Sequence, residues 1–490
     1  MESILISLDA GTTRVKAVAY SAGGELLAGA DATLAMQTPE PGAAELDPGA
    51  LAGACLEVLS RVARDITGLG RVEALVLSAQ GGSTLAAGGQ GEPLTGLITW
   101  MDTRHLDVLR GWEEDGTAGR IREVSGWYPQ PGLPLVVAAG LGRSRPELME
   151  GCRYLFSAND YIMYRLTGNR VTNPSCAAEM LLMDLKNGLW SRELCGLAGI
   201  QPGQLSEIRG SMEIAGTLSP EVSGATGLPE GLPVINGGQD HCCEAYALGI
   251  TRPGSGFLAC GTAWVINGVT QEIPAPDTGL DINYHVVEGL WLASRYLGGL
   301  GGTTQWWMTR FAPGISGEPA DQGQLFRRLE EILEEIPPGA GGVRFRPLDS
   351  SSGEAGAFTG LGLTHDIRHM TRALLESSGL LVAGALEDLK KSGTPLKELW
   401  MIGGAAESPR LVAMMADLWG IPVITGNFRH GPALGAAMLA ARALGYYRDE
   451  ESLRKAFRVE KTVYRPDPDR HELYRSLRNE AGSGREGRLK

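Results

Sequence analysis

Short apolar runs and polar turns alternate near the N-terminus. Two runs, at residues 4–10 and 14–21, are separated by a Gly-Thr-Thr turn, and a third, at 25–34, follows Gly23-Gly24. Short apolar runs bounded by glycine-rich turns are typical of β-strands joined as hairpins. The pattern therefore predicts an antiparallel meander of three strands at the start of the first domain.

A helix is predicted after the meander. Asp47 suits an N-cap, and Pro48 suits the first helical position, where no backbone N–H is needed. Apolar residues then recur at helical spacing along one face: Leu51, Cys55, Val58, Leu59 and Val62. Residues 72–80 follow as a buried strand, so strand and helix alternate as in a layered α/β sheet.

The opening pattern returns 250 residues later. Residues 231–270 contain, in order, a predicted strand, a glycine turn, an Ala-rich helix, a strand, a Gly-Thr turn and a strand. In this frame Gly11 matches Gly261, and Thr12 matches Thr262. The repeat indicates two related domains that open with the same β-turn-β unit, and a chance match of so short a motif is the alternative.

Strands and helices also alternate through the second half. Strands are predicted at 398–405 and 421–426, and helices at 366–393, 408–420 and 432–447. We expect a largely parallel sheet covered by helices on both faces. The chain beyond about residue 447 is rich in charge, which predicts an appendage with a frayed end.

Composition limits the class of protein. A chain of 490 residues favours two to four domains, and a formal net charge of −13 argues against a nucleic-acid partner, which needs a basic face. No apolar run approaches the roughly 20 residues of a membrane helix, and the acidic N-terminus lacks the basic region of a signal peptide. We therefore expect a cytoplasmic protein without a membrane partner. The seven cysteines lack C-x-x-C spacing, so we expect reduced thiols, and a homodimer is one possible assembly.

The Gly-Thr-Thr turn is a candidate phosphate site. Glycine lets successive backbone N–H groups converge on an anion, and the hydroxyls of Thr12 and Thr13 add donors. Asp9 would hold Mg²⁺, in part through water, and Arg14 or Lys16 would add positive charge. A hairpin with a merely polar turn is the alternative. The matching turn in the second half favours the phosphate interpretation, because two facing turns would clamp a polyphosphate.

Asp240 is a candidate general base. It stands at the start of the Ala-rich helix, just after Gly237-Gly238. A carboxylate there can accept the proton of a substrate hydroxyl during phosphoryl transfer. Capping of the helix is the alternative role for this side chain.

Two further clusters suit ligands. Trp100, Asp102 and Arg104 converge at a strand-to-helix junction, where an aromatic face and polar groups would hold a small polyhydroxylated ligand. Alternatively, Asp102 caps the next helix and Trp100 belongs to the core. The loop from Gly403 to Ser408 would place backbone against a nucleotide, or is an ordinary connection. A Walker A loop is excluded, because the chain has no Gly-Lys dipeptide.

Six motifs in order resemble the FGGY family of carbohydrate kinases, within the wider superfamily of sugar kinases, Hsp70 and actin. They are LDAGTTRVKAV, TWMDTR, NGGQD, CGTAW, GGTTQWW and GGAAESPRLVAMMADLWGIPV. The resemblance implies an α/β fold of two RNase H-like (actin-like ATPase) domains, with an inter-domain cleft for ATP, Mg²⁺ and a small sugar or polyol. The implied parts are an N-terminal domain at 1–248, a nucleotide-binding domain at 249–446 and an appendage at 447–490.

The resemblance also assigns site residues. Asp240 matches the family's catalytic base, and Asp9 would bind the metal. With Arg14 and Lys16 included, the expected nucleotide site comprises Thr12, Thr13, Arg14, Lys16, Gly261, Thr262, Gly301, Gln305, Gly404 and Ser408. The expected substrate site comprises Gln80, Gly81, Trp100, Asp102, Arg104 and Gln239.

Three departures from the family pattern concern the substrate. Family members commonly carry Met-His or Arg-Glu after the glutamine of the third strand, where this chain has Gly81-Gly82. Leu135 replaces a usual lysine, and Gln239 stands before the base in place of the histidine of Gly-His-Asp. We expect an ATP-dependent kinase of a pentulose such as xylulose or ribulose. A kinase of a non-sugar hydroxylated metabolite or signal molecule is the second candidate, and a non-catalytic nucleotide-binding switch is the rival.

Overall fold

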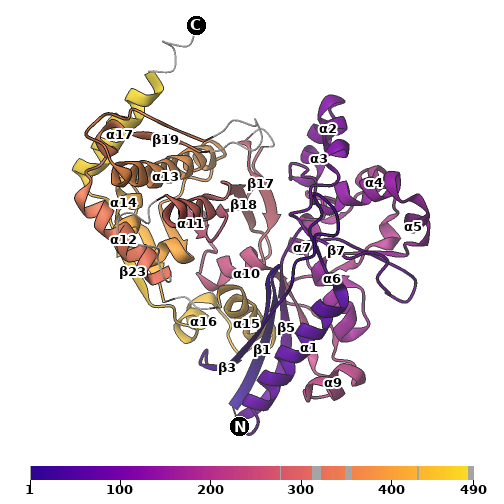
Figure 1. Ribbon diagram of the computed structural model, residues 1–490. Helices are drawn as coiled ribbons and strands as arrows, with labels where there is room; N and C mark the ends of the chain where they lie inside the picture. The colour runs from indigo at the N-terminus through magenta and orange to yellow at the C-terminus, as the bar shows by residue number, and fades with distance from the viewer. Residues whose placement is uncertain (1, 276–277, 312–321, 348–355, 428–429, 484–490) are drawn as a thin grey trace.

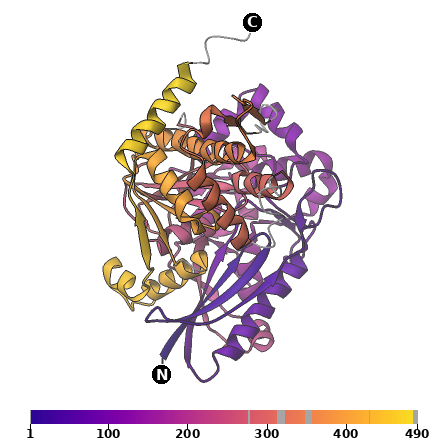
Figure 2. The same cartoon turned by 60° about the vertical axis from the view of Figure 1, so that its left-hand side comes forward.

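Two mixed β-sheets organise the chain, one in each of two lobes (Figure 1). The structure is a computed structural model that describes residues 2–275, 278–311, 322–347, 356–427 and 430–483. The N-terminus lies at the end of one lobe, and the C-terminal helix projects from the other lobe at the opposite end of the molecule (Figure 2). The predicted division into two α/β domains is confirmed.

The first sheet has six strands in the order β13-β14-β5-β1-β2-β3. The three N-terminal strands form the predicted antiparallel meander, and β5 and β14 extend it as parallel neighbours of β1. The strands are β1 (Glu2–Ala10), β2 (Arg14–Ser21), β3 (Leu26–Thr33), β5 (Gly70–Ala79), β13 (Ile214–Thr217) and β14 (Pro233–Gln239).

Helix α1 (Pro48–Asp65) covers one face of this sheet. Asp47 caps it as predicted, because its carboxylate accepts a hydrogen bond of 2.6 Å from the N–H of Ala50. The predicted apolar face of the helix is buried against β2 and β3.

Helices complete the first lobe. Those between β5 and β13 are α2 (Leu106–Glu114), α3 (Thr117–Ser125), α4 (Pro134–Ser144), α5 (Pro146–Gly151), α6 (Ala158–Thr167), α7 (Pro174–Ala178) and α8 (Arg192–Leu197), whereas α9 (Pro220–Thr226) connects β13 to β14 and packs on α1. Short paired strands connect them: β4 (Glu45–Leu46) with β7 (Leu97–Ile98), β6 (Leu85–Ala87) with β8 (Tyr154–Phe156), β9 (Val171–Thr172) with β12 (Glu207–Ile208), and β10 (Met183–Asp184) with β11 (Leu189–Trp190).

The second sheet has seven strands in the order β17-β18-β16-β15-β21-β22-β23. The expectation of a largely parallel sheet is wrong: only β15, β21 and β22 run parallel, and the other neighbours are antiparallel. The strands that tight turns connect pair antiparallel, whereas helical connections separate the parallel ones. The strands are β15 (Ser255–Cys260), β16 (Trp264–Thr270), β17 (Asp281–Tyr284), β18 (Trp291–Tyr296), β21 (Glu398–Ile402), β22 (Val423–Gly426) and β23 (Lys461–Tyr464).

Helices pack on both sides of the second sheet. They are α11 (Leu300–Arg310), α12 (Gln322–Glu335), α13 (Ile367–Lys391), α14 (Pro409–Trp419), α15 (Gly431–Ala443), α16 (Glu450–Ala456) and α17 (Pro468–Ser483), and a small β-pair joins β19 (Arg344–Arg346) to β20 (Ala357–Thr359). Helix α15 packs against α10 (Asp240–Ala247) and against β1 and β5 of the first sheet. One buried cluster therefore joins residues from both sheets.

Within residues 447–483, β23 and α17 pack on the second lobe and do not form the appendage that we expected. Strand β23 pairs with β22 at the edge of the sheet. The buried hydroxyl of Tyr474, on α17, accepts from Arg372 at 2.9 Å and donates to Glu376 at 3.1 Å. Charge dominates the composition of this segment, so its few buried contacts left no clear pattern in the sequence.

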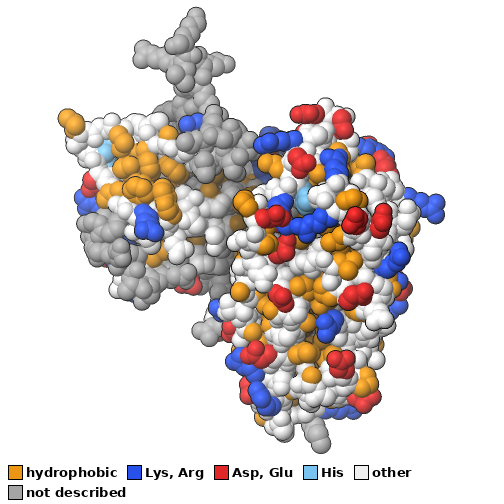
Figure 3. All heavy atoms as spheres, turned by 45° about the vertical axis from the view of Figure 1, so that its right-hand side comes forward, with side chains coloured by type: hydrophobic (Ala, Val, Ile, Leu, Met, Phe, Trp, Pro, Cys, Tyr) orange, Lys and Arg blue, Asp and Glu red, His pale blue; other side chains and the backbone are white. Residues whose placement is uncertain are grey.

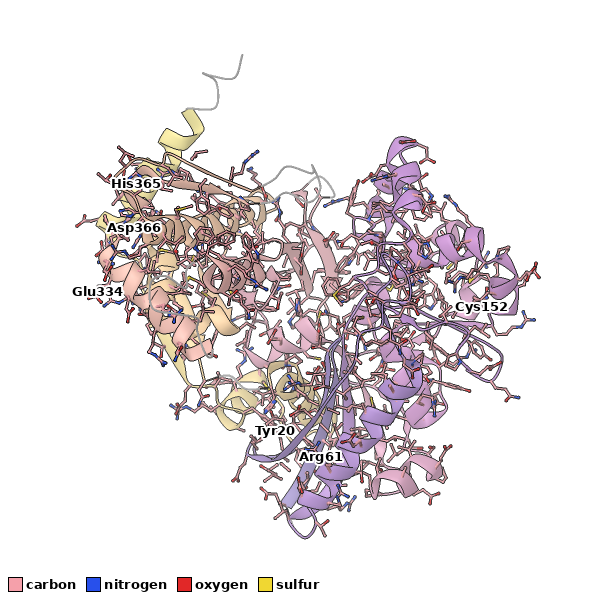
Figure 4. The ribbon with its side chains drawn as sticks, viewed as in Figure 1. Tyr20, Arg61, Cys152, Glu334, His365 and Asp366 are labelled. Atoms are coloured by element: carbon pink, nitrogen blue, oxygen red, sulfur yellow. The ribbon has the colours of Figure 1, made fainter. Side chains whose placement is uncertain are left out.

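The face of the first lobe that Figure 3 presents carries charges of both signs. Acidic and basic side chains are interspersed over it. His365 and Asp366 lie at the outer edge of the second lobe, where Asp366 caps α13 (Figure 4). No described helix is long and apolar enough to cross a membrane. All seven cysteines are buried and free, as expected.

Candidate active site

The Gly-Thr-Thr turn joins β1 to β2 at the carboxyl end of a central strand. Thr12 Oγ1 donates to Gln80 Oε1 at 2.7 Å and accepts from the indole Nε1 of Trp100 at 3.3 Å. Three predicted residues are therefore brought together beside the turn. Thr13 is exposed, and Arg14 is half exposed and pairs with Asp31 at 3.4 Å.

Asp9 is buried next to this turn. Its carboxylate accepts from Ser78 Oγ at 3.2 Å, and Lys16 lies opposite it on β2. Burial, followed by the negative charge of Asp240, raises the pKa of Asp9 to about 7, and Lys16 opposes that shift. The pKa of Glu244 is raised to about 8 by burial and then by Asp240 and Asp9. Carboxylates thus outnumber cations here.

This donor set fits a hard divalent cation. Within the described ranges, no three His, Cys, Asp or Glu side chains are grouped to hold a metal by themselves. Mg²⁺ needs no such group, because it keeps several waters and takes one or two carboxylates together with substrate phosphates. Carboxylate oxygens that repel one another when no cation is present suit the binding of Mg²⁺.

Asp240 is placed by a bulge in β14. The register of β14 against β5 shifts between Ile235 and Gly238, and Gly237 takes φ +70°. A Cβ at position 237 would lie 1.6 Å from the carbonyl oxygen of Leu77, so only glycine fits. The strand then passes directly into α10, whose first residue is Asp240.

The capping role falls to Gln239 and not to Asp240. Gln239 Oε1 accepts from the N–H of Cys242 at 3.1 Å, and its Nε2 donates to Asp240 Oδ1 at 2.5 Å. Asp240 Oδ1 also accepts from the N–H of His241 at 2.7 Å. Both polar atoms of Gln239 are used within the protein, which speaks against its predicted contact with substrate. Among the described residues nothing donates to Asp240 Oδ2, which leaves this oxygen for a ligand.

The second Gly-Thr turn joins β15 to β16, so the repeat in the sequence corresponds to a repeated hairpin. Gly301, on α11, packs directly on it: a Cβ at position 301 would lie 2.0 Å from the carbonyl oxygen of Gly261. The N–H of Gly302 donates to the carbonyl of Thr262 at 3.0 Å. Gly403 packs on the neighbouring Cys260: a Cβ at position 403 would lie 2.8 Å from the carbonyl oxygen of Cys260.

Two other predicted nucleotide residues lie on the elements that meet at this turn. Gln305 is exposed on α11, and Gly404 directly follows Gly403. Ser408 is fully buried, caps α14 by accepting from the N–H of Leu411 at 3.3 Å, and donates to Glu330. These bonds favour a structural role for Ser408 over contact with a nucleotide.

Asp102 and Arg104 also form their hydrogen bonds and ion pairs with other residues of the protein. Asp102 is fully buried and accepts from the N–H of Ala44 at 3.0 Å. Arg104 pairs with Asp102, with Glu40 at 2.8 Å and with Glu45 at 2.5 Å. These contacts are structural and do not favour the predicted polar contact with a ligand. The alternative that Asp102 caps the next helix is wrong as well, because the N-cap residue of α2 is His105. Trp100, at 39% exposure, remains open to a ligand.

Glu179 is a polar residue of this region that the sequence interpretation missed. It follows α7, is 8% exposed, and its Oε1 accepts from Asn283 Nδ2 on β17 at 3.1 Å. Its carboxyl group fills the space above Gly81, where a Cβ would lie 1.1 Å from Oε2. The available signal was a single acid within the apolar run 176–183. Leu135 is buried in a hydrophobic cluster and offers no polar contact.

Comparisons with known proteins cover almost the entire chain. Models of the N-terminal and C-terminal domains of the FGGY family of carbohydrate kinases match residues 4–247 and 256–444. A xylulose kinase from Bacillus subtilis is 27% identical over 505 residues, covering 96% of this chain and 95% of that protein. A gluconokinase from Bacillus licheniformis is 26% identical over 461 residues, covering 91% and 88%. The crystal structure of xylulose kinase from Rhodospirillum rubrum aligns with a TM-score of 0.91 at 26% identity, covering 98% of both chains.

Proposed function

Because the chain belongs to the FGGY family of carbohydrate kinases, we propose that it transfers the γ-phosphoryl group of ATP to a hydroxyl of a small sugar or polyol, with Asp240 as general base. The observation that supports this proposal most directly is how the two oxygens of the Asp240 carboxylate are hydrogen-bonded. One oxygen is held by Gln239 and by the N–H of His241, and the other accepts no bond from the described residues.

In the proposed reaction, an acceptor hydroxyl lies against Asp240 Oδ2. The hydroxyl oxygen forms a bond to the γ-phosphorus as the bond from that phosphorus to the β,γ-bridging oxygen breaks, and ADP leaves. The hydroxyl proton passes to Asp240. Gln239 acts as a positioning residue, because its amide holds the carboxylate in one orientation.

The two Gly-Thr turns would bind ATP. Thr12 and Thr13 offer hydroxyls and backbone N–H groups to the terminal phosphates, and Gly261 and Thr262 offer the second turn. Gly301, Gln305 and Gly404 lie on the elements around that second turn and would contact the rest of the nucleotide. Mg²⁺ would be held by Asp9, largely through water, and it neutralises charge on the phosphates when bound. Lys16 would add a fixed positive charge, whereas Arg14 is already paired with Asp31.

A pentulose such as xylulose or ribulose is the first candidate acceptor, because xylulose kinases recur among the relatives over nearly full length. The Gly81-Gly82 pair and Leu135 favour a second candidate, a hydroxylated metabolite that is not a sugar, since the usual bulky substrate residues are missing. The same departures motivate the rival of a nucleotide-binding switch without an acceptor.

An ADP-release screen with ATP and Mg²⁺ tests the proposal. The panel should contain ketoses, aldoses, linear polyols, sugar acids and smaller hydroxylated metabolites, each against a blank without acceptor. We expect acceptor-dependent ADP from at least one neutral member. Nucleotide binding without acceptor-dependent ADP from any member would favour the switch and contradict the kinase.

A further inference from the structure

The space that Gly81 leaves open is filled from a distant part of the chain. Gly81 directly follows Gln80, whose side chain accepts from Thr12, and it is partly exposed at the end of β5. The carboxyl group of Glu179 stands where a side chain at position 81 would stand. The carboxyl group of Glu179 thus occupies the space beside Gln80 that a side chain at position 81 would otherwise fill.

Glu179 is only partly satisfied by the protein. Asn283 donates to Oε1, and no described residue donates to Oε2. Oε2 can therefore accept a hydrogen bond from a ligand or from water. Burial, followed by the charges of Asp240 and Asp281, raises the pKa of Glu179 well above its ordinary range. Ser175, four residues before Glu179, accepts from the N–H of Gln239 at 2.9 Å, so the segment that carries Glu179 lies beside Asp240.

We propose that Glu179 contacts the acceptor and makes the site selective for an uncharged polyhydroxylated acceptor over a sugar acid. The inference rests on the proposed kinase function and names the acceptor class of that same site. An acceptor hydroxyl can donate to Oε2, which supplies the missing bond. A sugar acid would instead bring its own carboxylate against the carboxyl group of Glu179, and like charges at such close range repel each other.

The test compares xylulose and ribulose with gluconate, which is a close probe because a gluconokinase stands among the relatives. In the wild-type chain we expect kcat/KM for the better ketose to exceed that for gluconate by at least about 100-fold. Glu179→Gln keeps the shape of the side chain and removes its ability to ionise. It should lower that ratio by about 10-fold or more, chiefly through KM of the acceptors, while KM for ATP stays unchanged.

Two control measurements separate contact from general damage. Glu57→Gln, on the exposed side of α1, removes the same charge far from the site and should leave the ratio intact. Gly81→Ala should raise the acceptor KM in the wild-type background, because the new methyl group overlaps the Glu179 carboxyl. In a Glu179→Ala background the same change should have little effect, so the two substitutions are not additive.

The outcomes distinguish this inference from the function on which it rests. Absence of acceptor-dependent ADP across the wider panel overturns both. Turnover of a neutral acceptor with a ratio that Glu179→Gln does not change overturns the role of Glu179 alone. Preference of the wild-type enzyme for gluconate also overturns it, and leaves the kinase function standing.

Discussion

Asp240 and Gln239 are neighbours with different tasks, and the difference follows from where β14 ends. The backbone N–H groups at the start of α10 need an acceptor, which Gln239 Oε1 provides. Asp240 is therefore relieved of capping, and its Oδ1 is held while Oδ2 is left open.

Replacement of the proposed base tests this division. Asp240→Asn keeps the size of the side chain but removes its ability to take a proton, so kcat should fall by about 10² to 10⁴-fold. The nucleotide affinity, measured by calorimetry with a non-hydrolysable ATP analogue, should change little. Turnover close to that of the wild-type chain would contradict the assignment.

His285 makes the stability of the folded state depend on pH. It follows β17, is 4% exposed, and its Nδ1 accepts from the N–H of Val287 at 3.0 Å. Burial lowers its pKa to about 4. Between pH 6.5 and 4 the unfolded chain therefore binds more protons at this position than the folded chain does, so the folded state loses stability as the pH falls.

His285→Asn removes this titration and keeps a polar acceptor. The loss of unfolding free energy between pH 6.5 and 4, about 3 kcal/mol from this residue, should shrink in the variant. Urea titrations at several pH values measure it. His365→Asn, in which no buried imidazole is lost, should retain the wild-type slope, and an unchanged slope in His285→Asn would refute the argument.

At the scale of elements, local signals were predicted well and distant pairings were not. The opening meander and α1 follow from features within about 20 residues, such as Asp47, Pro48 and the turn glycines. The edge position of β23 depends on its pairing with β22, which begins 38 residues earlier in the chain. A strand as short as β23 also carries too little hydrophobic pattern to be recognised in the sequence. Glu179 meets Gly81 across almost 100 residues, so no local motif marks the contact.

The proposed site shows the same division. Asp9, Thr12 and Asp240 stand in motifs whose chemistry can be derived from residue type and spacing. Asp102 and Ser408 stand in equally suggestive motifs, but their side chains are bonded inside the protein. A polar side chain that is free to bind a ligand can be told from one that is already hydrogen-bonded only when its neighbours in the structure are known.

The packing of α10 on α15 links the proposed base to the second lobe. Gly435, on α15, lies against the backbone of α10, and a Cβ there would stand 1.8 Å from the carbonyl oxygen of Cys243. Gly435→Ala must push the helices apart, which typically costs about 1–3 kcal/mol, and it should shift Asp240 and lower kcat as well.

A matched control exists on α13. Gly384 is a helical glycine with no heavy atom within 4 Å of an added Cβ. Gly384→Ala should raise stability by about 0.5–1 kcal/mol through helix propensity and leave kcat unchanged. Equal behaviour of the two variants in thermal melts and turnover assays would contradict the role of the α10–α15 contact.

For the whole molecule, the two lobes share a buried core. The buried cluster around α10 and α15 takes Leu5 and Val76 from the first sheet and Phe257 and Ile402 from the second. Exposing either sheet alone would uncover apolar surface that the other lobe and the two helices now bury. We therefore expect the lobes to unfold together.

Equilibrium unfolding in urea tests this expectation. Tryptophan fluorescence and far-UV circular dichroism should give one transition with the same midpoint. Phe257→Ala, which removes a fully buried ring, should lower the free energy of unfolding by about 3–5 kcal/mol and move that transition as a unit. Two separate transitions, of which Phe257→Ala moves only one, would show that the lobes are independent. The coupling would then have to come from bound ligands, because the cluster shared by the sheets would be too weak to provide it.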